Sequence, residues 1–166
     1  MNTLANFTAQ AVYLDTMLPY IFLRSIDSAA KSFFERIEGG EFLAYTSILT
    51  FDELAYRLLL AFIKDHYNGS PLDHLRNEEN RMMTEFAPRV STLLQRLKDF
   101  PNLITLDILA SDLDAMIEAM TKYKLRPRDA LHLAAMQRAD CFNLASNDAH
   151  FDNVPKIQRF AIQQEL

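Results

Sequence analysis

The amino-acid sequence predicts an α/β domain in which helices cover both faces of a mostly parallel sheet of four or five strands. Short apolar segments of strand length alternate with longer segments whose apolar residues recur every three or four positions. Such alternation is typical of parallel sheets, because each parallel connection crosses the sheet through a helix. The chain has 166 residues, 49% of them hydrophobic, and no Gly- or Ser-rich linker divides it. We therefore expect a single domain over residues 1–166.

The first predicted strand is followed by two helices. Residues 11–15 form a short apolar run that ends in an acid, as expected for a buried strand. The apolar stretch after it turns into a first helix. The next helix begins after Asp27, carries apolar residues at helical spacing, and stops at Gly39 and Gly40.

The second strand leads into the longest helices of the chain. Residues 42–46 predict this strand, and a helix then opens at Thr50 and ends at the turn of residues 68–71. Residues 64–99 predict an extended helical region that is rich in charge, with Pro88 as a break in the helix.

The last third of the chain alternates strands and helices again. Residues 103–107 predict the third strand, and a helix continues to about residue 123. Pro127 suits the first turn of the following helix. Residues 141–146 predict the fourth strand, and residues 156–160 predict a short edge strand.

Charge and cysteine content limit the class of protein. The chain has 17 basic and 22 acidic residues, a net charge of −5, so bulk positive charge does not attract nucleic acid. Bound metal ions can still reverse the sign of the charge locally. A single cysteine, Cys141, excludes an internal disulfide, and neither a basic leader nor a membrane-length apolar run is present. We therefore expect a cytoplasmic protein.

Acidic residues lie where the predicted strands end. Asp15 closes the first strand, and Asp148 follows the fourth, with Asp152 four residues later. Glu53 lies in the first turn of the helix after the second strand, and Asp129 in the first turn of the helix before the fourth. Ligands of open α/β sheets bind beyond the carboxyl ends of the strands, so these acids can converge there. Clustered carboxylates repel one another and indicate a hard cation such as Mg²⁺ or Mn²⁺.

Each acid also has a purely structural interpretation. Thr50 and Glu53 match a helix capping box. Asp129 would be favoured by the helix dipole at the third position of its helix. Asp148 and Asp152 suit loop and helix-cap positions.

With these acids in these positions, the sequence resembles a known family, the PIN-domain nucleases, which includes the toxins of VapBC-type toxin–antitoxin pairs. The resemblance lies in VYLDTMLPYIFL (12–23), TSILTFDELAYRL (46–58) and LRPRDALHLAAMQRADCFNLASNDAHF (125–151), and in the closing KIQRF strand. The third block is the specific one, since it pairs an Asp-Ala-Leu-His-Leu-Ala helix with a strand ending in Ser-Asn-Asp.

The resemblance implies a PIN-like three-layer α/β/α fold and a metal-dependent ribonuclease. Carried over by position, it implies that Mg²⁺ or Mn²⁺ is held by four catalytic acids, Asp15, Glu53, Asp129 and Asp148, with Asp152 as an additional candidate ligand. Thr16 and Ser146 correspond to hydroxyl residues beside the ligands. Among partners it implies an RNA substrate, an antitoxin if the chain is a toxin, a homodimer, and no membrane.

Three features depart from the family pattern. Met17 stands where an asparagine often follows Asp-Thr, and His150 replaces an acid, with Asp152 just beyond it. The segment between Glu53 and Asp129 is also longer than in compact toxins, which the extended helical region would explain.

A basic strip directly precedes Asp129. KYKLRPR contains four basic residues and no acid: Lys122, Lys124, Arg126 and Arg128. Such a strip can guide an RNA backbone toward the metals, since phosphate contacts give affinity without sequence selectivity. It is equally consistent with a solvated helix end.

His132 lies one helical turn from Asp129, where it could donate a hydrogen bond to that carboxylate or pack inside the domain. We favour packing. The spacing of His66 and His74 matches no zinc site.

The acids and the resemblance together predict a metal-dependent endoribonuclease that cleaves RNA phosphodiester bonds, and the resemblance adds the toxin of a toxin–antitoxin pair as one role of such an enzyme. The alternative is a non-catalytic PIN-fold module that binds RNA or acts as a scaffold. A third interpretation, a nuclease acting on DNA flaps, requires DNA-gripping additions for which the chain is short.

Overall fold

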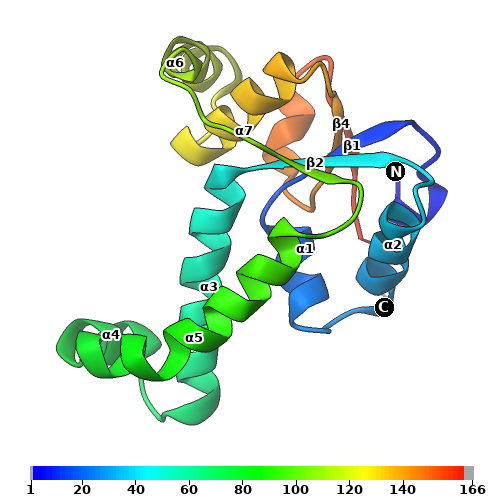
Figure 1. Cartoon of the computed structure of the whole chain (residues 1–166). Coiled ribbons are helices and arrows are strands. Elements are labelled where there is room, and N and C mark those ends of the chain that lie inside the picture. Colours follow the sequence, from blue (N-terminus) through cyan, green and yellow to red (C-terminus); the bar gives the residue numbers. More distant parts are fainter. Residues whose placement is uncertain (1, 163–166) are drawn as a thin grey trace.

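The computed structural model describes residues 2–162 and is built around one parallel sheet (Figure 1). Its strands are β1 (Ala11–Leu14), β2 (Leu43–Ser47), β3 (Leu103–Leu106), β4 (Asn143–Ala145) and β5 (Gln158–Phe160). Their order is β3-β2-β1-β4-β5, and each neighbouring pair is parallel. The predicted α/β fold is confirmed, including the edge strand β5.

β1 lies in the centre of the sheet and contributes to two hydrophobic cores. Val12 and Leu14 are buried in one core, and Tyr13 is buried in the other, because successive side chains of a strand point to opposite faces. Tyr13 pairs in register with Tyr45 of β2 on one side and with Leu144 of β4 on the other. Burial on both faces explains why this strand is apolar throughout.

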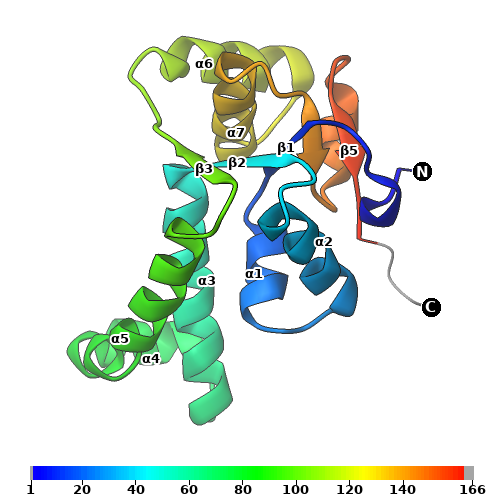
Figure 2. The same cartoon turned by 45° about the vertical axis from the view of Figure 1, so that its right-hand side comes forward.

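Helices form a layer on each face of the sheet (Figures 1 and 2). One core packs α1 (Met17–Leu23), α2 (Ser28–Glu38), α3 (Ile48–His66) and α5 (Glu79–Lys98) against the sheet, and the other packs α6 (Asp112–Tyr123) and α7 (Pro127–Arg138). Two short 3₁₀ helices are η1 (Leu4–Asn6) and η2 (Ala149–Asn153). No helix in the described part of the chain is long and apolar enough to cross a bilayer.

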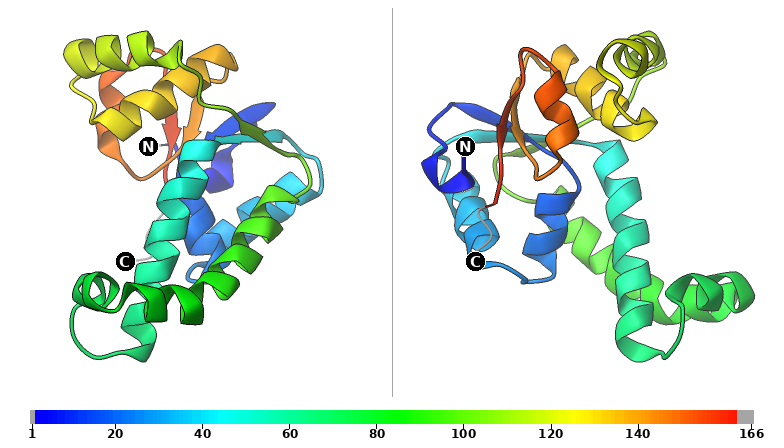
Figure 3. Two further views of the ribbon diagram at one scale, coloured as in Figure 1. Left: turned by 60° about the vertical axis from the view of Figure 1, so that its left-hand side comes forward. Right: turned by 180° about the vertical axis from the view of Figure 1, so that it is seen from behind.

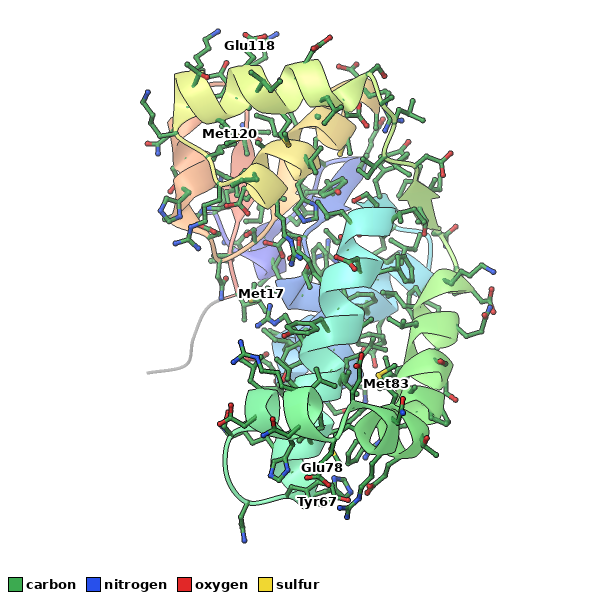
Figure 4. All side chains as sticks on the ribbon, turned by 90° about the vertical axis from the view of Figure 1, so that its left-hand side faces the viewer. Met17, Tyr67, Glu78, Met83, Glu118 and Met120 are labelled. Atoms are coloured by element: carbon green, nitrogen blue, oxygen red, sulfur yellow. The ribbon has the colours of Figure 1, made fainter. Side chains whose placement is uncertain are left out.

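The predicted helical region corresponds to an arm that extends away from the sheet (Figure 3). In this arm α3 and α5 lie side by side and α4 (Pro71–Asn77) connects them at the far end. Figure 4 shows Tyr67 and Glu78 at that end, where Arg81 donates to both side chains at 3.1 and 2.7 Å. The arm therefore accounts for the long segment between Glu53 and Asp129.

Pro88 does not break the helix, contrary to the prediction. It lies inside α5 with an exposed side chain, and it removes one backbone hydrogen bond from a helix of 20 residues. Phe86 and Val90, on either side of Pro88, are buried in the core beside α3. The burial of these side chains outweighs the local preference of proline, since packing supplies most helix stability in proteins.

The start of α3 also differs from the prediction. The helix begins at Ile48, and Ser47 is its N-cap residue. Thr50 is buried inside the first turn, so the capping-box interpretation of Thr50 and Glu53 is wrong. Glu53 consequently lies in the second turn, where it has no capping function.

Candidate metal and RNA site

The four predicted catalytic acids lie around the carboxyl ends of the two central strands. Asp15 follows β1, and Asp148 follows β4 as the N-cap of η2. Glu53 comes from α3, and Asp129 from the first turn of α7. From β1 the chain continues to β2 and β3 on one side of the sheet and then returns to β4 on the other side of β1. The strand order therefore reverses between β1 and β4, and ligands of open α/β sheets usually bind at such a topological switch point. Figure 4 shows Met17, just after Asp15, near the place where α3 and α7 approach each other.

Protein donors hold both carboxylate oxygens of Glu53. Thr16 Oγ1 donates to Oε2 at 3.1 Å, and His132 Nε2 lies 3.3 Å from Oε1. Burial acts to raise the pKa of Glu53, but the hydrogen bond and charge of His132, with the Thr16 hydroxyl, lower it below its ordinary value. Glu53 is therefore an ionised and oriented carboxylate.

His132 belongs to a buried polar chain, which sequence reasoning did not find. Its Nδ1 lies 2.8 Å from Tyr13 Oη, and Tyr13 Oη donates to Ser47 Oγ at 2.8 Å. His132 is packed inside the domain as expected, but its acidic partner is Glu53 and not Asp129. The only signal in the sequence was a histidine on an otherwise apolar helix face.

The start of α1 holds Asp15. The Met17 backbone N–H donates to Asp15 Oδ1 at 3.0 Å, and the nearby Ser146 hydroxyl acts to lower the pKa of the carboxylate. Burial nevertheless raises the pKa of Asp15 above its ordinary value, because these contacts and the nearby His132 do not compensate for the loss of water.

Asp129 has no donor for one of its oxygens. Its Oδ2 is buried and has no hydrogen-bond partner among the described residues. Burial raises the pKa of Asp129, and the negative charges of Asp148 and Glu53 raise it further. A buried carboxylate oxygen without a donor is rare in folded proteins and indicates a missing cation or other ligand.

Asp148 is fixed by its own loop. Its Oδ1 accepts from the backbone N–H of His150 at 2.9 Å and lies 2.6 Å from His150 Nδ1, while Ser146 Oγ accepts from the Asp148 N–H. Burial acts to raise the pKa of Asp148, but the two contacts with His150 lower it. His150, one of the departures from the family pattern, therefore orients an acid of the cluster.

Comparison with known proteins decides the family. The sequence profile of the PIN domain matches residues 12–157. The chain belongs to the PIN-domain family. No curated protein matches its sequence. The resemblance inferred from the sequence motifs is confirmed.

Toxins and toxin–antitoxin complexes are among the solved structures similar to this PIN domain. VapBC2 from Rickettsia felis, bound to a DNA fragment from their promoter, is 12% identical with a TM-score of 0.63, covering 91% of this chain and 98% of that chain. VapC20 from Mycobacterium tuberculosis, a Sarcin-Ricin loop cleaving toxin, is 11% identical with a TM-score of 0.57, covering 85% and 92%. A toxin–antitoxin complex from Klebsiella pneumoniae is 17% identical with a TM-score of 0.52, covering 89% and 95%. At these identities the likeness shows the fold.

PIN domains usually bind divalent metals, and the acids of this PIN domain fit such an ion. No three His, Cys, Asp or Glu side chains within residues 2–162 are already gathered as a complete ligand set. The fit comes from the chemistry of the donors: four carboxylates, one of which has the unpartnered oxygen of Asp129. Hard oxygen donors of this kind suit Mg²⁺ or Mn²⁺.

Asp152 is not a free carboxylate, because it forms an ion pair with Arg159. Arg159 donates to both of its oxygens at 2.8 Å, and this ion pair lowers the pKa of Asp152. As a metal ligand, Asp152 would have to give up part of this bidentate pair.

The basic strip divides into two halves. The charges of Arg126 and Arg128 act on the acids, Arg126 on Asp129 and Asp148, and Arg128 on Glu53. The two lysines are turned elsewhere: Lys124 Nζ donates to the Thr121 carbonyl at 2.7 Å, and Lys122 lies 3.8 Å from Glu118. Figure 4 shows Glu118 on the side of α6 that faces away from the rest of the molecule.

Proposed function

We propose that this PIN domain is an endoribonuclease that depends on Mg²⁺ or Mn²⁺ and cleaves RNA phosphodiester bonds. The observation that carries the proposal is the buried, unpartnered oxygen of Asp129 beside the charges of Asp148 and Glu53. A cation between these carboxylates would remove their repulsion and provide the missing partner.

The proposed ligands are Asp15, Glu53, Asp129 and Asp148. Divalent ions bound there would polarise the phosphodiester and activate a water molecule for attack on phosphorus. Thr16 and His132 keep Glu53 ionised and oriented, and the Met17 N–H orients Asp15. These contacts hold the acids in place before substrate arrives, which is how hydrogen-bond partners of ligands support metal sites.

Positive charge close to the acids supports an RNA backbone as the substrate. Arg126 and Arg128 lie at the start of α7, beside the carboxylates, in a chain with a net charge of −5. Guanidinium groups bind phosphates through charge-assisted hydrogen bonds; Arg126 is available for this, and Arg128 lies 3.6 Å from Asp52, from which it would turn to a phosphate. Contacts of this type position a strand without selecting its sequence.

The proposal is tested by cleavage of a labelled single-stranded RNA by the purified full chain. We expect cleavage in Mg²⁺ or Mn²⁺, none in EDTA, and none with Asp15→Asn, while the exposed Asp114→Asn control cleaves like wild type. A DNA strand of the same sequence tests the DNA-nuclease alternative. RNA binding without cleavage in either metal would instead identify a non-catalytic RNA-binding module.

We further propose that the chain is the toxin of a toxin–antitoxin pair, supported by the toxins and complexes among its structural neighbours. Expression of the wild-type chain should arrest growth of a bacterial host, and expression of Asp15→Asn should not. Equal growth with both proteins would contradict the toxin assignment.

A homodimer is part of the same proposal. Three apolar side chains in and before α6 are exposed: Leu109 (43%), Leu113 (52%) and Ile117 (58%). Apolar residues exposed in this way suit a protein contact. Light scattering at micromolar concentration should give twice the mass of the chain, and the mass of a monomer would contradict the proposal.

A further inference from the structure

Glu53, one of the four acids, is hydrogen-bonded to a chain of polar side chains that is buried beneath α7. Ser47 and Tyr13 have no exposed surface, and His132 is 2% exposed. Tyr13 and His132 are 2.8 Å apart, and the chain ends at Glu53 Oε1, 3.3 Å from His132 Nε2. Buried polar groups are unfavourable unless their hydrogen bonds are satisfied, so the proton positions along this chain are strongly constrained.

Only proton arrangements with a hydrogen on His132 Nε2 satisfy the chain. If Tyr13 donates to Ser47, His132 Nδ1 must donate to Tyr13, and an Nε2 without hydrogen would leave a lone pair against the Glu53 carboxylate. If Ser47 donates to Tyr13 and Tyr13 donates to Nδ1, the neutral ring carries its hydrogen on Nε2. In the first arrangement the ring carries hydrogen on both nitrogens, and in the second on Nε2 alone, so in both His132 Nε2 donates to Glu53.

We propose that His132, fixed by Tyr13 and Ser47, is a positioning residue that holds the Glu53 carboxylate in the geometry needed for the metal. This inference rests on the proposed metal-dependent function. His132 is too deeply buried to reach a substrate phosphate, so it acts through Glu53 and not on RNA.

The two donors to Glu53 come from segments that carry the other acids. Thr16 directly follows Asp15, and His132 is on the same helix as Asp129. Their hydrogen bonds therefore fix Glu53 relative to Asp15 on one side and Asp129 on the other. A free glutamate would lose rotamer entropy when it binds a metal, and a glutamate already held by donors loses less. Each held oxygen keeps a second lone pair for the ion.

The tautomer can be measured without metal. In the full chain with ¹⁵N-labelled histidine, two-bond ¹H–¹⁵N NMR spectra should show hydrogen on His132 Nε2. The Nε2 resonance should shift in Glu53→Gln and stay unchanged in Asp114→Asn. A ring protonated on Nδ1 alone, or an Nε2 resonance that ignores Glu53→Gln, would overturn the inference.

Mn²⁺ binding to the metal-free full chain, followed by isothermal titration calorimetry, tests the consequence. His132→Leu keeps an apolar side chain of similar size without a donor, and we expect at least about tenfold weaker binding. His132→Gln can donate to Glu53 and accept from Tyr13, so it should restore most of the affinity. Wild-type affinity in His132→Leu, or failure of glutamine to rescue, would overturn the positioning role alone. A wild-type chain that binds no Mn²⁺ would overturn this inference together with the proposed function.

Discussion

The four acids Asp15, Glu53, Asp129 and Asp148 form what we call the acid cluster, in which Glu53 lies on the α3 side and Asp129 on the α7 side. The two sides differ in how many of their carboxylate oxygens accept hydrogen bonds from the protein. On the α3 side, Thr16 and His132 hold both oxygens of Glu53 and keep its pKa low. On the α7 side, Asp129 has a buried oxygen with no donor and a raised pKa. The hydrogen bonds of Glu53 are thus satisfied without a ligand, whereas a bound cation would stabilise Asp129 most. Substitutions on the two sides should therefore have different effects on the metal-free fold and similar effects on catalysis.

The largest expected effect is the loss of cleavage on both sides. Asp129→Asn and Glu53→Gln should each slow RNA cleavage by about 100-fold or more, which corresponds to a loss of roughly 3 kcal/mol of transition-state stabilisation. Single-turnover rates in Mn²⁺ measure this effect. A variant that cleaves at the wild-type rate would return its carboxylate to a structural role.

The effects on the stability of the metal-free chain should have opposite signs. Asp129→Asn removes a repelling charge, and its new amide can donate to a neighbouring carboxylate, so it should stabilise the fold by about 1 kcal/mol. Glu53→Gln removes the charged acceptor of Thr16 and His132 and should destabilise it by about 1 kcal/mol. Each change corresponds to a shift of about 2–4 °C in thermal unfolding in EDTA. Shifts of the same sign would contradict the contrast between the two sides.

The same contrast has a pH signature. The pKa of Asp129 is raised in the folded chain, so its ionisation costs stability as pH rises from below its ordinary value of 3.8 through the folded value. The advantage of Asp129→Asn over wild type should therefore grow across that range. The pKa of Glu53 is lowered, so its contribution is present above 4.5 and disappears as pH falls through the folded value. Urea unfolding in EDTA between pH 3 and 7 measures both trends, and parallel curves for a variant and wild type would contradict them.

The smallest effects should come from the basic strip, and they should differ between its halves. With Ca²⁺ in place of Mg²⁺, replacing Arg126 and Arg128 by alanine should weaken RNA binding and flatten the salt dependence by about 1.4 log units per log unit of salt, for two lost phosphate contacts. Replacing Lys122 and Lys124 should have a weaker effect, because those lysines contact Thr121 and Glu118. Fluorescence anisotropy over a salt series measures the slopes. Equal slopes for the two double variants would show that the strip acts as one surface.

Local patterns explain which parts of this molecule the sequence predicts. The strands are short apolar runs, Asp15 follows β1 directly, and Asp148 lies in the loop just after β4, so the sheet and its acidic edge follow from spacing alone. Glu53 is predicted from the helix after β2 and Asp129 from the helix before β4, in both cases together with the motifs of the family.

The partners of these acids depend on tertiary contacts. His132 lies 79 residues from Glu53 in sequence, and their contact exists only because α3 and α7 meet at one edge of the sheet. The pairing of Asp152 with Arg159 likewise needs the fold of the loop before β5. Pro88 shows the same limit, since the burial of its neighbours against the core keeps α5 continuous.

Thermal unfolding with and without Mn²⁺ is the most direct test of the claim that these acids form a metal site. At Mn²⁺ concentrations about 100-fold above the dissociation constant, the wild-type chain should gain roughly 2.7 kcal/mol, or about 5–10 °C. Asp15→Asn should lose most of this gain, and Asp114→Asn, an exposed acid on α6, should keep it. A wild-type chain whose unfolding temperature is unchanged by millimolar Mn²⁺, or a full gain in Asp15→Asn, would contradict the account.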